Sequence, residues 1–356
     1  MVDQTKPWDP ESDAIPTAVA ERIGRRGGTA TIYDIAELAG VSPSTVSRAL
    51  STPGRISQKT EAKIRAAATR LDFRVNPMAR GLHSGRSHTI ALVVADITNP
   101  VVFGIVRGAE QAASAAGYTL VIAESQESGP TEAEAVARLI PSVDGIVLAT
   151  TRLADERISE IAARKPVVLI NRFVDGVPSV LPDVEQGVSQ VIDHLAELGH
   201  GSIVYVAGPD TSWISGRRWE TILQAAEERQ IAAVEIGPTP PTIPGGRDVV
   251  RRVLAARPTA VVAFNDLIAI GIMQAAADRG IRIPDDLSVI GFDDILGSEL
   301  IVPALTTVRS QLPAAGARAV ASILRRVEAT AEPPDADLPL LETTLIVRGS
   351  TGRTRP

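Results

Sequence analysis

A short stretch near the start of the sequence carries side chains suited to contacts with DNA. Ser42 is a good helix cap, and Pro43 is favoured at the first helical position because its missing N–H costs nothing there. The helical period turns an apolar stripe inward and leaves polar side chains outward. The outward residues are Ser44, Thr45, Ser47 and Arg48. Arginine can donate two hydrogen bonds to one guanine, and hydroxyls can bind phosphate oxygens, so this helix has the chemistry to contact DNA.

A second set of polar side chains stands near the ends of apolar runs in the rest of the chain. Asn171, Asn265 and Asp293 each close such a run, and Arg217 follows the turn at Gly208-Pro209. A guanidinium, two amides and a carboxylate can satisfy several hydroxyls or a carboxylate on a small polar ligand, and polyols such as sugars fit best. The alternative is structural, because Asn and Asp are common at strand ends as turn formers and helix caps.

Motifs for catalysis or metal binding are missing from the sequence. It contains no His-Glu-x-x-His, no Gly-x-Ser-x-Gly and no phosphate-binding loop. Its four histidines are widely spaced and it has no cysteine, which leaves no thiolate metal site and no thiol nucleophile. We therefore expect no enzyme activity, no metal and no cofactor.

Three short helices are predicted to position the first set. Thr31 and Asp34 form a capping pattern that begins one helix, and Gly40 permits the left-handed turn that ends it. The helix at Pro43 follows, and a third helix, capped by Ser57, packs its apolar residues against the other two. Two short helices joined by a glycine-containing turn describe a helix-turn-helix, although an ordinary helical hairpin has the same pattern.

The charge distribution separates this helical head from the rest of the chain. The 356 residues carry a formal net charge of -6, yet residues 29–86 hold nine basic and four acidic side chains, a balance of +5. Residues 87–356 hold 23 basic and 33 acidic side chains, a balance of -10. A polyanion such as DNA therefore suits the head alone.

The pattern changes from His88 onward, where apolar runs alternate with amphipathic helices and indicate parallel sheets of βα units. Two successive series, 88–180 and 183–293, predict two lobes of similar build, with a ligand site in the cleft at the strand carboxyl ends. The expected strands are Ile90–Ala95, Thr119–Ala123, Gly145–Ala149, Val167–Ile170, Ile203–Ala207, Ala260–Phe264 and Ser288–Phe292.

The beginning of the chain lacks a continuous apolar stretch that could act as a secretory signal, and we interpret residues 1–28 as a disordered leader. No run approaches the roughly 18 apolar residues of a membrane-spanning helix. The absence of cysteine suits a reducing compartment. These features favour a cytoplasmic, nucleoid-associated protein without a membrane partner over an exported solute-binding protein, whose core would have the same pattern.

The run from Thr31 to Leu50, TIYDIAELAGVSPSTVSRAL, closely resembles the start of lactose/galactose-repressor (LacI/GalR) family regulators. The resemblance implies that Pro43, Ser44 and Arg48 address base edges, with Arg48 the strongest candidate. It places four further side chains at phosphates: Tyr33, Ser42, Thr45 and Ser47.

The run Asn76-Pro77-Met78-Ala79-Arg80-Gly81-Leu82-His83 looks like the family's hinge helix, within a hinge or linker over residues 76–86. By this resemblance two hinges, one per subunit, fold together in the minor groove, where a leucine wedges between base pairs and kinks the DNA. Leu82 matches that leucine, and His83 beside it joins the expected DNA contacts. The alternative for Leu82 is packing within its own domain.

Several motifs in the rest of the chain resemble the periplasmic sugar-binding-protein fold that the family uses as its sensor. They are Asn99-Pro100, Asp144-Gly145-Ile146, Leu198-Gly199-His200, Asn265-Asp266 and Gly291-Phe292-Asp293-Asp294. The implied fold class is an α/β core of two doubly wound parallel-sheet lobes, preceded by an all-α helix-turn-helix domain at residues 29–75. The implied core spans 87–350, with lobe 1 at about 87–181 plus 295–325, lobe 2 at about 182–294 plus 326–350, and a tail at 351–356.

Residues matched one at a time to the family's effector-contacting positions are Asn171, Arg217, Asn265 and Asp293. Asp183 is a fifth candidate, which could instead cap the helix that starts near Glu185.

Two departures from the family pattern bear on the effector. Val101 and Val102 stand where many relatives have aromatic residues, and an aromatic residue near Pro240 is also missing. Trp213 could supply a flat surface for a sugar ring, or it could be ordinary packing.

Together these features predict a transcriptional regulator, most simply a repressor, that binds a near-palindromic operator as a homodimer under the control of a small polar effector. A sugar or sugar derivative is the expected effector. The alternatives are a nucleoside or another polar metabolite, or a corepressor in place of an inducer. By the resemblance the family dimerises through both lobes, and paired heads would read half-sites roughly one helical turn apart.

Overall fold

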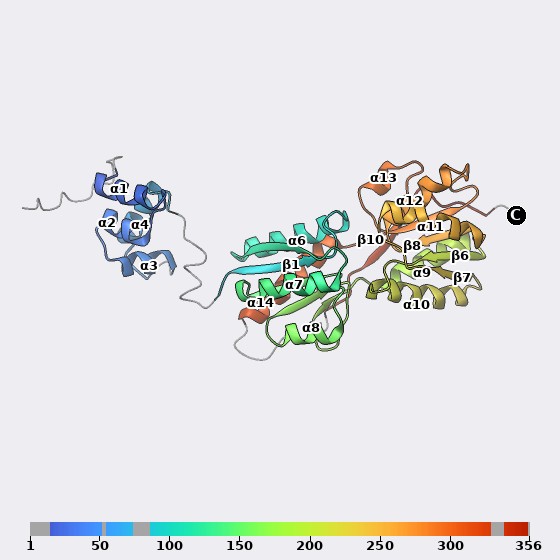
Figure 1. Ribbon diagram of the computed structural model, residues 1–356, viewed down its shortest axis with the longest axis horizontal. Coiled ribbons are helices and arrows are strands. Elements are labelled where there is room, and N and C mark those ends of the chain that lie inside the picture. Colours follow the sequence, from blue (N-terminus) through green and yellow to red (C-terminus); the bar gives the residue numbers. More distant parts are fainter. Residues whose placement is uncertain (1–14, 52–54, 74–85, 329–337, 355–356) are drawn as a thin grey trace, which may run out of the picture. The chain divides into compact units, whose positions relative to one another are not determined.

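The computed structural model describes residues 15–51, 55–73, 86–328 and 338–354. The chain forms two compact units, residues 1–85 and 86–356. Figure 1 shows helices in the first unit and helices combined with strands in the second. Along these described ranges, no helix is long and apolar enough to cross a membrane.

The helical unit has four helices among its described residues: α1 (Thr17–Arg25), α2 (Ile32–Ala39), α3 (Pro43–Ser51) and α4 (Gln58–Arg70). Gly40 ends α2 in the left-handed conformation, with φ 66°, and the Ser57 hydroxyl caps α4 by accepting from the Thr60 amide. The last three helices confirm the predicted trio. Four side chains form the fully buried centre of their core: Val19, Ile35, Val46 and Ile64.

Helix α1 corrects the expectation of a disordered leader over residues 1–28, which is wrong for Thr17–Arg25. Val19 is fully buried in the core of the unit, and Ile15 and Ile23 pack partly against it. These three apolar residues recur at four-residue spacing, which places them on one face of a helix. Their stripe is short and stands among proline and charged residues, so the composition concealed it. Residues 1–14 lie outside the described residues.

The first lobe of the α/β unit contains a five-stranded parallel sheet in the order β2-β1-β3-β4-β5. Its strands are β1 (Thr89–Val94), β2 (Thr119–Glu124), β3 (Gly145–Ala149), β4 (Val167–Ile170) and β5 (Ser179–Val180). Its helices are α6 (Val101–Ala115), α7 (Gly129–Leu139), α8 (Asp155–Ala162) and α14 (Leu312–Glu328), with a 3-10 turn at Ile140–Ser142.

Two layers of helices enclose this sheet. Residues of α6 and α14 share one buried cluster with one face of the strands, and residues of α7 and α8 share another with the opposite face. Helix α14 packs very closely on α6, because a Cβ at Gly316 would lie 2.0 Å from the Ile105 carbonyl oxygen. A segment from the far end of the sequence therefore completes the first lobe (Figure 1).

The second lobe contains a six-stranded sheet in the order β11-β10-β9-β8-β6-β7, parallel except for β11. Its strands are β6 (Ser202–Val206), β7 (Ala232–Ile236), β8 (Ala260–Ala263), β9 (Ser288–Asp293), β10 (Thr306–Ser310) and β11 (Thr343–Ile346). Its helices are α9 (Val184–Glu197), α10 (Trp213–Glu228), α11 (Ile243–Ala255), α12 (Asp266–Ala277) and α13 (Gly297–Leu300). Tyr205, Val250, Ile268 and Ile290 lie at the fully buried centre of its core.

All seven predicted strands are present to within one residue or two, and the fold class is confirmed. The boundary within the closing segment was wrong, because β10 pairs with β9 and so places residues near 306–310 in lobe 2 rather than lobe 1. Strand β7 was missed because it lies at a sheet edge, where three of its five residues are exposed and no apolar run forms.

The expected tail at 351–356 is in part a packed segment of lobe 2. The Gly352 amide donates to the Ser288 hydroxyl at 3.1 Å, and the Thr354 amide donates to the Leu198 carbonyl at 3.1 Å. Backbone hydrogen bonds of this kind leave little sequence signature, because any residue can make them.

We predict that Val19→Ala lowers the stability of the helical unit by about 1–3 kcal/mol, since it removes methyl groups from a fully buried site. Hydrogen exchange of the α2, α3 and α4 amides in the full-length chain, followed by mass spectrometry, measures the free energy of opening. Ala20→Ser, on the exposed side of α1, is the matched control. Equal protection in the two variants would show that α1 does not support the unit.

Candidate DNA interface and effector pocket

The polar face of α3 is exposed as the helical period predicts. Ser44 and Arg48 are exposed, Thr45 and Ser47 are partly exposed, and the helix turns Val46 inward. The Ser42 hydroxyl caps the helix, because it accepts from the Thr45 amide at 3.3 Å and lies 2.8 Å from the Thr45 hydroxyl.

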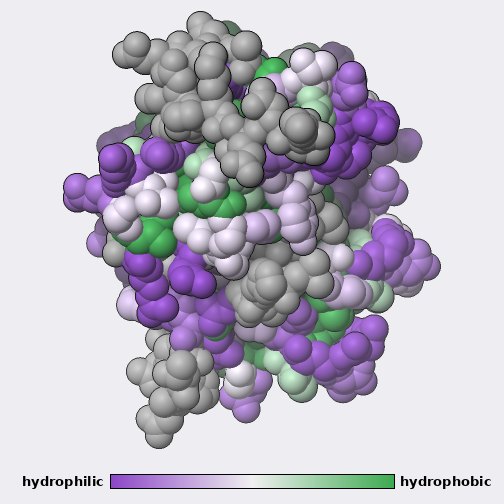
Figure 2. Space-filling model, turned by 90° about the vertical axis from the view of Figure 1, so that its left-hand side faces the viewer, coloured by the Kyte–Doolittle hydropathy of each residue, from purple (hydrophilic) through white to green (hydrophobic). Residues whose placement is uncertain are grey.

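The remaining predicted DNA contacts divide between described and undescribed residues. Tyr33 on α2 is 66% exposed, Ser42 is exposed and Pro43 is partly exposed. Hydrophilic residues predominate on the face of the molecule in Figure 2, where apolar patches are small. Leu82 and His83 lie outside the described residues, so their assignment stays a prediction.

A buried carboxylate fixes the start of α2. Asp34 is fully buried, and its Oδ2 accepts from the Thr31 amide at 2.8 Å and from the Thr31 hydroxyl at 2.7 Å. Its Oδ1 accepts from Arg22 Nε and Arg26 Nη2, both at 2.9 Å, and Arg22 also pairs with Glu37 at 2.6 Å. Helix α1 thus supplies counter-ions for the cap of the first helix in the helix-turn-helix.

The titration of Asp34 reflects a balance between burial and these donors. Burial by itself raises the pKa of the carboxyl, but hydrogen bonds from Thr31, Arg22 and Arg26 outweigh it and lower the pKa from 3.8 to about 2. A charged carboxylate in the first turn also interacts favourably with the helix dipole.

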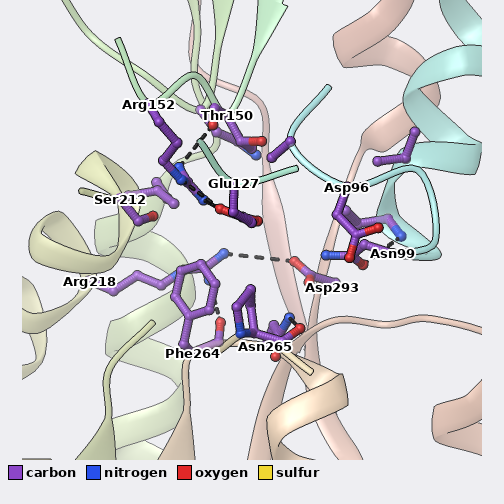
Figure 3. Close-up of a pocket in the computed structure, with 16 residues that line it drawn as sticks. Asp96, Asn99, Glu127, Thr150, Arg152, Ser212, Arg218, Phe264, Asn265 and Asp293 are labelled. Carbon is purple, nitrogen blue, oxygen red and sulfur yellow. Dashed lines mark hydrogen bonds and ion pairs between the residues drawn. The ribbon is translucent and has the colours of Figure 1, made fainter. Parts of the chain in front are cut away.

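In the α/β unit a pocket lies where strands of both lobes end (Figure 3). Asp96, Asn99, Thr150 and Asn171 approach it from β1, β3 and β4 of the first lobe. The second lobe contributes its own set: Ser212, Arg218, Phe264, Asn265 and Asp293. The pocket holds about 490 Å³ of atom-free space, part of it open to solvent, which lies in the range typical of small-molecule sites.

Arg218 is the central cation of the lobe-2 side of the pocket. Its side chain is 6% exposed, Nη1 donates to the Phe264 carbonyl at 2.5 Å, and Nη2 lies 3.9 Å from Asp293 Oδ1 (Figure 3). The guanidinium also lies over two aromatic rings, 4.2 Å from the centroid of Phe292 and 5.3 Å from that of Phe264. Pairing and stacking together make burial of this charge tolerable.

Asp293 is held close to neutrality. Burial raises the pKa of its carboxyl, Arg218 opposes that rise and the nearby Asp266 adds to it, which gives a pKa of about 7. Its backbone takes a positive φ of 112°, as the chain turns sharply out of β9. A half-neutral carboxyl beside a guanidinium can both donate to and accept from hydroxyl groups.

A matching ion pair stands on the lobe-1 side. Arg152 Nε donates to Glu127 Oε2 at 2.7 Å, and Nη1 donates to the Thr150 carbonyl at 2.8 Å. Glu127, Thr150 and Asn171 have φ values of 58°, 57° and 57°, so three loops at this edge adopt the left-handed conformation. Such residues are uncommon away from glycine, and they turn the side chains of the strand ends toward the pocket.

The predicted effector residues separate into two groups. Asn171, Asn265 and Asp293 line the pocket. Arg217 and Trp213 do not, and they line an adjoining hollow instead. Asn265 also caps α12, since Oδ1 accepts from the Ile268 amide at 2.9 Å and Nδ2 donates to the Pro241 carbonyl at 3.1 Å.

The prediction for Arg217 is one residue away from the pocket. Arg217 is 41% exposed and pairs with Glu185, and also with Glu220 at 3.4 Å. One residue along a helix turns the side chain by about 100°, so Arg218 points inward where Arg217 does not. The sequence held a signal for this, because Arg218 falls at four-residue spacing in the buried stripe Ile214, Ile222 and Ala226.

Asp183 lies outside the pocket as well, and its alternative role holds. Its carboxylate caps α9 by accepting from the Gln186 amide at 2.9 Å. Its backbone joins two chain segments that cross between the lobes, since its amide donates to the Leu341 carbonyl at 2.7 Å and its carbonyl accepts from the Thr343 hydroxyl at 2.7 Å.

Sequence reasoning missed Asp96, Asn99, Glu127, Thr150, Arg152, Ser212, Arg218 and Phe264 as pocket residues. Asp96, Thr150 and Phe264 immediately follow β1, β3 and β8. The carboxyl ends of parallel strands meet at one sheet edge, so a position just past each predicted strand was an available signal.

Comparison with known proteins bears on what this site serves. The profile of bacterial regulatory proteins of the lacI family matches residues 31–76, and that of the periplasmic binding protein-like domain matches residues 192–351. The ribose operon repressor of Halalkalibacterium halodurans is 32% identical over 325 residues, which cover 90% of this chain and 97% of that protein. The chain belongs to the lacI family. Family members are ligand-responsive transcriptional regulators.

Further relatives of this lacI-family chain differ in their named ligands. The transcriptional repressor CytR of Escherichia coli K12 is 31% identical over 335 residues, covering 90% of this chain and 96% of that protein. Among solved structures, a lac repressor dimer bound to operator and the anti-inducer ONPF has a TM-score of 0.81 at 27% identity, covering 91% of this chain and 99% of that one. A complex of the regulator CelR with cellobiose has a TM-score of 0.66 at 26% identity, covering 90% and 99%. Helix α1 precedes the part that the lacI-family profile matches.

We predict that Arg22→Ala combined with Arg26→Ala raises the pKa of Asp34, because the burial remains while two of its donors are lost. In the unchanged chain the lowered pKa contributes stability that is present above about pH 4 and is lost as the pH falls through about 2. In the variant that loss should begin at a higher pH.

Selective ¹³C labelling of aspartate carboxyl groups allows the Asp34 titration to be followed by NMR. Arg25→Ala, which removes a side chain that is 78% exposed, is the control and should leave the Asp34 titration unchanged. An Asp34 pKa equal in both variants would mean that α1 does not act through this carboxylate.

Proposed function

We propose that this chain represses transcription by binding a near-palindromic operator as a homodimer, and that a small neutral polar effector in the pocket between its lobes controls that binding. The observation that carries the proposal is the buried Arg218–Asp293 pair facing the Arg152–Glu127 pair across a pocket in the lacI-family core. A sugar or sugar derivative is the proposed effector.

The exposed face of α3 supports direct contact with DNA. We assign Pro43, Ser44 and Arg48 to base edges, and Arg48 is the residue best able to recognise guanine. The proposed phosphate contacts are Tyr33, Ser42, Thr45 and Ser47, with Leu82 and His83 in the minor groove.

An apolar surface on lobe 2 supports self-association. Leu296, Leu300 and Val302 are 75%, 72% and 96% exposed, around a groove lined in part by Ile270 and Met273. Apolar side chains gathered at such exposure mark interaction surfaces. A second copy of the chain is the proposed partner, and it would carry the second helical head to the second half-site.

The pocket chemistry supports a neutral polyol as the effector. Each arginine there already faces a carboxylate, so the pocket offers hydrogen bonds rather than net positive charge. Asn99 and Asn171 add amide donors and acceptors. A nucleoside would use the same groups and is the alternative that a ligand screen must separate.

Effector control follows from the way the chain crosses between the lobes. The crossings lie near residues 180–184, 310–312 and 341–343, and two of them are hydrogen-bonded together at Asp183. A ligand that touches both lobes stabilises one angle between them, and it can shift the equilibrium only by its differential affinity for the two arrangements. We propose that this angle sets whether the paired heads fit the operator, and that the protein acts in the cytoplasm without catalytic activity.

We predict that Arg48→Ala weakens binding to the preferred duplex by about 1–3 kcal/mol and relaxes selectivity at one base pair. The preferred duplex is first selected from a random pool, and dissociation constants are then measured by mobility shift at one fixed salt concentration. Lys59→Ala, an exposed single-charge loss on α4, is the control and should lower specific and non-specific affinity alike. Unselective binding by the intact chain at every salt concentration would refute the regulator proposal.

We predict that Arg218→Ala weakens effector binding by about 10- to 100-fold, since it removes charged hydrogen bonds and leaves Asp293 without its partner. Calorimetry with a panel of sugars, polyols and nucleosides measures the affinity. Arg229→Ala, at the far end of the same helix and paired with the exposed Asp193, is the control. Circular dichroism of Arg218→Ala confirms that it is folded. Full affinity in the folded Arg218→Ala variant would place the effector elsewhere.

A further inference from the structure

The hollow that adjoins the effector pocket has its own polar and aromatic lining. It holds about 910 Å³ of atom-free space, part of it open to solvent, against about 490 Å³ in the pocket itself. Leu153 and Arg172 line it from the first lobe, and Trp213 and Glu220 line it from α10 of the second. The hollow is large enough for a group the size of a sugar ring.

Two residues line both spaces and so connect them. Arg152 belongs to the pocket and to the hollow, and so does Ser212, the residue before α10. Both are drawn in Figure 3, where Arg152 approaches from lobe 1 and Ser212 from lobe 2. A ligand that passed between them would occupy both spaces at once.

Two buried polar atoms at this boundary have no hydrogen-bond partner. They are the hydroxyl oxygen of Ser212, which is 3% exposed, and Nε of Arg172, whose side chain is 15% exposed. Buried polar groups are almost always hydrogen-bonded, because leaving one unpaired costs roughly 1–3 kcal/mol. A hydroxylated ligand would satisfy both.

The charge of the hollow excludes an anionic occupant. Arg152 pairs with Glu127, Arg172 with Asp155, and Arg217 with both Glu185 and Glu220. Asp210 adds a further carboxylate to the lining. A phosphate or carboxylate ligand would meet at least as many negative as positive charges, whereas a neutral hydroxylated ring meets donors and acceptors of both kinds.

Trp213 provides the flat surface for such a ring. It is the first residue of α10, it is partly exposed, and it follows Ser212 directly. An indole offers a large apolar face with one N–H donor at its edge, which suits a group that is apolar on its faces and polar around its rim.

We propose that the hollow is a second ligand subsite, which binds the second ring of a disaccharide or glycoside on Trp213 while the first ring occupies the Arg218–Asp293 pocket. This inference rests on the proposed effector function and specifies its ligand: the effector is a neutral two-ring sugar, and the Ser212 hydroxyl and Arg172 Nε bind oxygens near the link between the rings.

The test compares each disaccharide with its component monosaccharides, by calorimetry on the full chain. The probes are cellobiose, lactose, maltose, sucrose and trehalose, with glucose, galactose and fructose. We expect at least one disaccharide to bind about tenfold or more tightly than its components, and Trp213→Ala to remove that advantage while monosaccharide affinity stays unchanged. Trp213→Phe should restore part of it, because a ring remains.

Trp219→Phe on the same helix is the matched control. Trp219 stacks on Tyr205, with ring centroids 6.0 Å apart, and lines neither space. If a monosaccharide binds as tightly as every disaccharide that contains it, or if Trp213→Ala lowers both affinities equally, the second subsite is refuted while the effector pocket stands. If no sugar binds and another ligand does, the sugar effector and the subsite both fail.

Discussion

The direction of the strands decides where this protein can bind a ligand. Ten of the eleven strands run parallel to their neighbours within two sheets, so their carboxyl ends gather at one edge of each lobe. Polar residues are tolerated there because the backbone leaves the sheet and the apolar core ends. Asn171 after β4 and Asn265 after β8 occupy such positions. The chemistry of the pocket is therefore a consequence of topology before it is a matter of individual side chains.

Within that constraint, the charges of the pocket are nearly balanced before any ligand arrives. Arg218 is enclosed by two aromatic rings and faces Asp293, whose pKa of about 7 leaves it partly neutral. Arg152 is bound to Glu127. An effector therefore does not need to neutralise the site, and it competes with water for directed hydrogen bonds. Such a site recognises the arrangement of hydroxyl groups rather than total charge.

Much of this architecture could be read from the sequence, because strongly periodic segments report their own burial. The helices of the head and the seven predicted strands carry apolar patterns that few other structures would satisfy. The effector arginine could not be chosen from the position of a turn alone, since Arg217 and Arg218 are adjacent and the helical phase distinguishes them. Strands β10 and β11 belong to lobe 2 through pairing between distant segments, which local patterns do not encode. The lining by Ser212 and Arg152 depends on how two lobes approach each other, which is likewise a property of the folded chain.

Asp34 also joins two parts of the sequence that a family comparison would treat separately. The residue lies within the part that the lacI-family profile matches, whereas Arg22 and Arg26 lie before it. A carboxylate at an exposed helix start tolerates exchange for other capping residues at small cost. Here the same carboxylate is fully buried against two cations, so a substitution at Asp34 would leave both arginines without their partner. The N-terminal helix and the cap of α2 are thus bound to change together in evolution, and a lineage that loses one must soon replace the other.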